Sequence, residues 1–186
     1  MESNFIELHD LPVYEDLLDE FFRLVDPEKG SQVCLNSIEG REDDIYFGAG
    51  SLKYDWANTT FTETGEKIVP LRNPPLREKY FTKLCNHFKN TKFEKVYDAL
   101  NEKYHLGRVR VMISYPGTCL SWHEDGEDRI HFPMYTQEGC FMVIEDEVKH
   151  LEKNKWYYTK TLKKHTAFNA SKDRRIHLVA NIRDIR

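Results

Sequence analysis

Several classes of protein are excluded by what this sequence lacks. No apolar run reaches the roughly 18 residues that a membrane-spanning helix needs, so we expect no role in a membrane. The first ten residues, MESNFIELHD, contain neither the basic segment nor the apolar segment of a secretory signal peptide. We therefore expect a cytoplasmic protein.

Cysteine and basic charge are also limited. The four cysteines (Cys34, Cys85, Cys119 and Cys140) form no CxxC pair, which argues against a structural zinc knuckle and for reduced thiols. The 27 lysines and arginines are outnumbered by 31 aspartates and glutamates, and the net charge of -4 argues against a broad surface for nucleic acid. No internal repeat, low-complexity tract or linker divides the chain.

Some basic residues nevertheless lie close to candidate strands. We expect them to form a solvated basic edge, and contact with an anionic substrate is the alternative interpretation. These residues are Arg108, Arg110, Lys163, Lys164 and Arg174.

The N-terminal half of the chain contains three candidate helices. Apolar residues recur at helical spacing over residues 11–25, 76–89 and 92–104, and the last two are predicted to form a helical hairpin against a sheet. Residues 31–72 hold short β-like runs between glycine, aspartate and asparagine turns. We interpret residues 1–106 as helices and substrate loops, whose aromatic residues either line a substrate mouth or pack onto the domain.

In the C-terminal half the hydrophobic period changes to two. One face of the first strand there carries Val109, Val111, Ile113 and Tyr115. Further strand candidates follow, separated by polar turns. Many short strands predict a sandwich or barrel. We expect a mainly β fold with flanking α-helices, in which residues 107–186 form the core of a single domain spanning residues 1–186.

A candidate metal site follows the first of these strands. His123 and Asp125 are two residues apart, so their side chains point to the same side of an extended chain. His165 begins a later strand and is the third candidate ligand. Two imidazoles and one carboxylate leave coordination positions open, a ligand set that suits non-haem Fe(II). Zn(II) with a bound water is the competing assignment.

Arg175 distinguishes these two metals. It lies ten residues after His165 and shares a strand face with His177 and Val179, which is compatible with a side chain that points into a barrel. A buried guanidinium binds a planar carboxylate through two charge-assisted hydrogen bonds. Such a group next to the metal site suits the dicarboxylate 2-oxoglutarate, whereas a hydrolytic zinc site has no evident use for it.

These residues resemble the aspartyl/asparaginyl β-hydroxylase family of Fe(II)- and 2-oxoglutarate-dependent dioxygenases. The resemblance covers about residues 108–185. It depends on Pro116-Gly117-Thr118 ahead of His123, on Arg129-Ile130-His131, and on His165, Asn169 and Arg175-Ile176-His177-Leu178.

The resemblance implies a double-stranded β-helix, a cupin-like jelly roll. It also implies that His123 and His165 bind iron, that Arg175 binds the distal carboxylate of 2-oxoglutarate, and that Arg129 and His131 lie near the other end of this cosubstrate. The human-type members lack a metal-binding carboxylate, whereas this chain offers Asp125.

The function expected on these grounds is hydroxylation of a C–H bond by O2, with Fe(II) as cofactor and 2-oxoglutarate as cosubstrate. The substrate is a small molecule or a peptide, and an amino-acid or peptide side chain is one candidate. Two alternatives belong to other classes: a jelly-roll binding module with a degenerate site, and a cupin-like zinc enzyme.

Overall fold

A computed structural model describes residues 2–186, with the exception of the side chain of Ala57. The described residues form two α-helices, four short 3-10 helices and fourteen strands. Their bounds are β1 (Phe5–Leu8), α1 (Leu17–Leu24), η1 (Pro27–Lys29), β2 (Gln32–Cys34), β3 (Asn36–Ser37), η2 (Trp56–Asn58), β4 (Thr60–Phe61), β5 (Lys67–Ile68), η3 (Glu78–Tyr80), β6 (Lys83–Leu84), η4 (Asn86–Phe88), α2 (Lys92–Lys103), β7 (Tyr104–Ser114), β8 (Thr118–Cys119), β9 (Asp128–Tyr135), β10 (Cys140–Ile144), β11 (Glu147–Lys149), β12 (Trp156–Thr159), β13 (His165–Asn169) and β14 (Arg175–Ile185).

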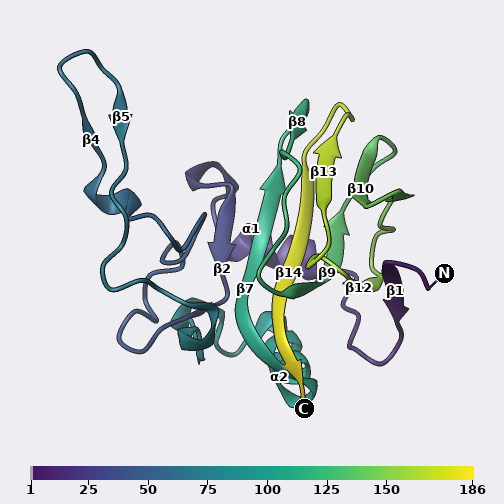
Figure 1. Ribbon diagram of the computed structural model, residues 1–186. Coiled ribbons are helices and arrows are strands. Elements are labelled where there is room, and N and C mark those ends of the chain that lie inside the picture. The colour runs from purple at the N-terminus through teal and green to yellow at the C-terminus, as the bar shows by residue number, and fades with distance from the viewer. Residues whose placement is uncertain (1) are drawn as a thin grey trace.

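The strands form two principal antiparallel sheets. The larger has the order β1-β12-β9-β14-β7-β2, and the smaller has the order β11-β10-β13-β8. Along the chain, β7, β8, β9 and β10 alternate between the two sheets, and β12, β13 and β14 alternate again (Figure 1). This alternation of strands between two sheets is that of a jelly roll, the double-stranded β-helix that the sequence predicts. The fold is therefore mainly β with flanking helices, as expected.

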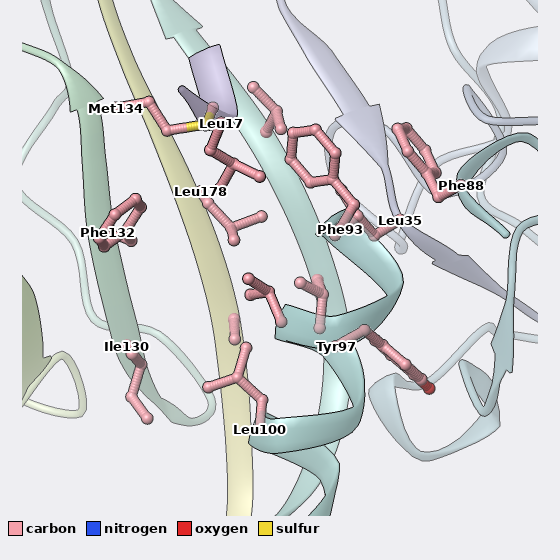
Figure 2. Close-up of a cluster of buried hydrophobic side chains, with 14 of the residues drawn as sticks. Leu17, Leu35, Phe88, Phe93, Tyr97, Leu100, Ile130, Phe132, Met134 and Leu178 are labelled. Atoms are coloured by element: carbon pink, nitrogen blue, oxygen red, sulfur yellow. The ribbon is translucent and has the colours of Figure 1, made fainter. Parts of the chain in front are cut away.

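The main hydrophobic core lies between the larger sheet and the helices. Alternation along β7 points Val109, Val111 and Ile113 to the helical side, where all three are buried. Helix α2 supplies the opposing side chains of this core (Figure 2). The cluster also includes Leu17, Leu35, Phe88, Phe93, Tyr97, Leu100, Ile130, Phe132, Met134 and Leu178. The other face of the larger sheet is consequently turned toward the smaller sheet and lines the interior of the jelly roll.

Two of the predicted helices differ from those observed, while α2 agrees with the prediction. Helix α1 begins only at Leu17. Before it, a turn closes between Tyr14 and Leu17, and the carbonyl of Pro12 accepts a hydrogen bond from the indole of Trp156. No α-helix forms over residues 76–89. Tertiary pairing overrides the local helical pattern there: β6 pairs with β3, and the Glu78 carboxylate is held by Arg108.

Residues 31–72 form short strands and long loops, as predicted. Strands β4 and β5 make a hairpin that stands away from the rest of the molecule (Figure 1). The base of this hairpin is attached to the larger sheet, because the Arg108 guanidinium donates to the carbonyls of Gly48 and Gly50. Across residues 2–186, no helix has the length and apolar character that crossing a membrane would require.

The prediction that five basic residues form a solvated edge is wrong for two of them. Arg108 and Arg110 are on the interior face of β7 and are only 6% and 3% exposed. Arg108 is paired with Glu78 at 2.7 Å, whereas Arg110 donates to the neutral oxygens of Gln32 and Asn181. Burial lowers the pKa of Arg110 to about 9, and the neighbouring charges of Arg108 and Arg129 act in the same direction. Alternation of β7 explains the placement, since the helical side is already occupied by valine and isoleucine.

Candidate metal centre

The structure brings the three predicted metal-binding side chains together. His165 opens β13, and His123 lies in the loop between β8 and β9, bridged to His165 by two backbone hydrogen bonds of 3.0 and 2.9 Å. Asp125 follows in the same loop, where its backbone N–H donates to the Thr161 carbonyl. One potential ligand atom from each residue lies within 4.8 Å of the other two. Backbone hydrogen bonds thus hold the segment of His123 and Asp125 against His165, which is about forty residues later in the chain.

Hydrogen bonds orient both imidazoles toward a common point. The Nδ1 atoms of His123 and His165 lie 2.7 and 2.9 Å from the carbonyl oxygens of Ser121 and Lys163. Each ring therefore uses Nδ1 on a backbone oxygen and directs Nε2 inward. Metal-binding histidines in proteins are held in this way, with the second nitrogen donating to a carbonyl or carboxylate. The Nε2 atoms face the carboxylate of Asp125 at 3.9 and 3.2 Å.

The Asp125 carboxylate is divided between two neighbours. Its Oδ1 accepts a hydrogen bond from Nη2 of Arg129 at 2.5 Å, while its buried Oδ2 has no donor and lies 3.2 Å from Nε2 of His165. Burial acts to raise the pKa of Asp125, but the close contact with the His165 imidazole and the charge of Arg129 outweigh burial, so the pKa is lowered. A deprotonated carboxylate with one unsatisfied oxygen beside two imidazole nitrogens is suited to hold a divalent cation.

The side chain of Arg175 lies inside the jelly roll, on the side of the sheet that faces the candidate metal ligands. It lies opposite Ser114 on β7, and both line a cavity of about 270 Å³ that extends to Leu120 and Ala167. Ala167 is two residues from His165 on β13, or about 7 Å along a strand. Within the described residues Arg175 forms no salt bridge, its Nε has no hydrogen-bond partner, and burial lowers its pKa. A partly buried guanidinium without an acidic partner is costly, and a bound anion would compensate its charge.

Two further histidines lie between Arg175 and the candidate ligands. His131 and His177 are 8% and 4% exposed, and their rings meet edge to face with centroids 5.8 Å apart. Burial, reinforced by the charge of Arg175, lowers both pKa values well below the ordinary range, so both rings are neutral. Neither nitrogen of His131 has a hydrogen-bond partner, and the same holds for Nε2 of His177. Both rings line a second, smaller pocket, which shares Ala167 and Arg175 with the larger cavity.

Sequence reasoning missed part of this arrangement. The pairing of Arg129 with Asp125 was not anticipated. A separation of four residues predicts an ion pair in a helix, but these two residues lie in a loop and a strand. Ser114 was also missed. It lies opposite Arg175 on the neighbouring strand, and both residues line the cavity. His177 was recognised as part of the Arg175–Leu178 motif but was given no role, although its strand parity with Arg175 places it in the interior.

The fold and this centre define a class: jelly-roll proteins with a His–Asp–His cluster at the mouth of the barrel. The sequence profile of the family described as Aspartyl/Asparaginyl beta-hydroxylase matches residues 14–184. The chain belongs to this family and is accordingly a 2-oxoglutarate-dependent hydroxylase of the 2-oxoglutarate/Fe(II) oxygenase type. The family resemblance inferred from the C-terminal motifs is thereby confirmed and extended to nearly the whole chain.

Comparison with other proteins gives only remote similarities. No curated protein matches the chain. A viral collagen prolyl hydroxylase from Paramecium bursaria Chlorella virus-1 is 10% identical over 97% of both chains, with a TM-score of 0.45. A 2OG-Fe(II) oxygenase family oxidoreductase from Burkholderia pseudomallei is 11% identical over 94% of both chains, with a TM-score of 0.39. A cupin domain from Bordetella pertussis Tohama I is 19% identical over 41% of this chain and 80% of its own, with a TM-score of 0.36.

Proposed function

We propose that this protein hydroxylates a small-molecule or peptide substrate, with Fe(II) held by His123, Asp125 and His165 and with 2-oxoglutarate held by Arg175. The observation that carries the proposal is the partly buried Arg175, which has no acidic partner and lines a cavity next to the three-residue cluster. A dicarboxylate satisfies both parts of this site, because one end ligates the metal and the other neutralises the guanidinium.

The residues present fit the metal and the cosubstrate. Oδ2 of Asp125 and the Nε2 atoms of the two histidines supply three nitrogen and oxygen donors on one side of the ion, which leaves positions open. Bound iron and 2-oxoglutarate would supply the chemistry that uses O2: one oxygen atom would enter the substrate C–H bond and the other would enter succinate, with release of carbon dioxide. The task of the protein is to fix these groups, exclude water and position the substrate.

Individual side chains divide this task. Arg175 fixes the distal carboxylate. The neutral rings of His131 and His177 line the adjoining smaller pocket beside Arg175, where they offer hydrogen bonds without adding charge. Ser114 extends the polar end of the cavity beside Arg175. Because these groups come from central strands of the larger sheet, their positions are fixed by backbone pairing on both sides.

The two other classes explain less of the structure. A zinc hydrolase accounts for the cluster but gives Arg175 no role, and a degenerate binding module leaves the orientation of both ligand histidines without purpose. Membership of a hydroxylase family also favours the enzyme.

Anaerobic titration of the apoprotein with Fe(II) and 2-oxoglutarate tests the proposal. A visible metal-to-ligand charge-transfer band is expected in the native protein and in His87→Ala, whose ring is exposed and distant from the cluster. The band is expected to vanish in His165→Ala. Absence of the band in the native protein, despite bound metal, would contradict the proposal. Zinc retained through purification, together with activity without O2, would favour the hydrolase instead.

A further inference from the structure

The pairing of Arg129 with Asp125 has a geometry that a simple ion pair does not need. Nη2 of Arg129 lies 2.5 Å from Oδ1, and the two side chains are only 14% and 13% exposed. The second carboxylate oxygen, Oδ2, accepts no hydrogen bond although it is buried, and it faces Nε2 of His165. One oxygen is thus occupied by the guanidinium and the other is directed at the candidate metal position.

The two partners differ in how firmly the backbone holds them. Arg129 is on β9, which pairs with β12 on one side and with β14 on the other, so its main chain is fixed in the middle of the larger sheet. Asp125 lies in the loop that follows β8, where a backbone hydrogen bond to Thr161 and the bridge at His123 provide the nearby attachments. A ligand on a loop needs support from a rigid element to keep its geometry.

We propose that Arg129 is a positioning residue for the metal centre: it holds Oδ1 of Asp125 so that Oδ2 alone ligates the ion. This inference presupposes the metal site of the proposed function. Hydrogen bonds to ligating carboxylates orient them and tune the ion in other metal sites. The planar guanidinium of arginine suits the role better than an ammonium, because its N–H groups donate in fixed directions whereas those of an ammonium rotate freely.

The proposal assigns Arg129 a different partner from the one that the family resemblance implies. A cosubstrate anchor would direct its guanidinium into the cavity, whereas Nη2 of Arg129 is directed at Asp125 and Arg129 does not line the cavity. Arg175 meets that description instead, since it has no acidic partner and lines the cavity. The two arginines on the interior face therefore have separate roles, one for the ligand and one for the cosubstrate.

Metal titration without 2-oxoglutarate separates the two assignments. Co(II) binding to the apoprotein is followed through its visible d–d spectrum, which reports affinity and ligand geometry together. Arg129→Met is expected to weaken Co(II) binding by about 10- to 100-fold and to change the shape of the spectrum. Arg129→Lys should recover only part of the affinity. The control is Arg174→Met, which removes an arginine paired with Glu28 outside the barrel and should leave the affinity within about threefold.

A double-mutant cycle tests whether the effect passes through the carboxylate. In an Asp125→Ala background, Arg129→Met should have no further effect on Co(II) affinity, because the group that it positions is gone. The inference is overturned if Arg129→Met leaves Co(II) binding unchanged and weakens only 2-oxoglutarate, or if its cost persists in the Asp125→Ala background. Failure of the native protein to bind Co(II) would instead overturn the metal site itself. If Arg129→Met does not fold, the same comparisons are made with Arg129→Lys.

Discussion

Replacing Arg175 by methionine should weaken cosubstrate binding and stabilise the apoprotein at the same time. The guanidinium is buried without an acidic partner, and its lowered pKa shows that the interior disfavours its charge. Losing one partner of a buried charged pair costs about 2–4 kcal/mol of binding, so the Kd for 2-oxoglutarate should rise roughly 30- to 700-fold. In the absence of ligand the same substitution removes an uncompensated charge from the interior, which should add about 1 kcal/mol of stability.

Thermal unfolding with and without ligand measures both effects. For a chain of this length, 1 kcal/mol corresponds to a rise in Tm of about 2–4 °C. Native protein with Fe(II) should be stabilised by a further ~2.7 kcal/mol when 2-oxoglutarate is present at a hundredfold excess over its Kd, and Arg175→Met should lose this increment. The control Arg174→Met should change neither quantity appreciably. A fall in the Tm of apo Arg175→Met with unchanged 2-oxoglutarate affinity would show that Arg175 is a structural cation, and the reasoning would fail.

Three further predictions concern stability. Gly107→Ala should destabilise the fold by about 1–3 kcal/mol in denaturant titration, because an added Cβ would lie 2.8 Å from Cβ of Glu78, whereas Gly126→Ala, which meets nothing within 4 Å, should have little effect on stability. Glu78→Gln should cost about 3 kcal/mol because it leaves its buried arginine partner unpaired, and Lys163→Gln, which breaks an exposed pair, should stay within about 0.5 kcal/mol; equal costs would refute this burial argument. The pKa of His177 is lowered in the folded state, so the unfolded chain binds more protons below about pH 6.5; the free energy of unfolding should therefore fall as the pH drops from about 6.5 to 5, and this slope should diminish in His177→Phe.

Local patterns predicted the parts of the structure in which one period dominates. The alternation of valine and isoleucine in β7 identified a strand with one buried face, and helix α2 was predicted almost to its bounds. The HxD spacing and His165 could be recognised because two residues on one side of an extended chain, plus one distal histidine, form a ligand set with few other uses. The parity of Arg175 on β14 correctly placed it in the interior.

The predictions that failed concern contacts between distant segments. Phe81, Cys85 and Phe88 have the spacing of a helix and are all buried. The backbone is nevertheless not helical, because β6 pairs with β3 and the Glu78 carboxylate binds the buried Arg108. The burial of Arg108 and Arg110 could not be read locally, since an arginine in an alternating strand is usually on the solvent side. Only the presence of helices on the other face of the sheet turns these charges inward.

The hairpin of β4 and β5 is separated from the constraints that govern the rest of the chain. Among residues 51–72 whose side chains are described, none belongs to either hydrophobic cluster, and several large apolar side chains, including Trp56, Phe61 and Leu71, are exposed. Most substitutions here therefore leave folding intact, so the sequence of this segment can drift or be exchanged between lineages while the barrel persists. Natural selection can preserve these exposed side chains only through what the hairpin touches outside the molecule. A change of sequence in this hairpin would thus alter what the molecule touches without altering how its barrel folds.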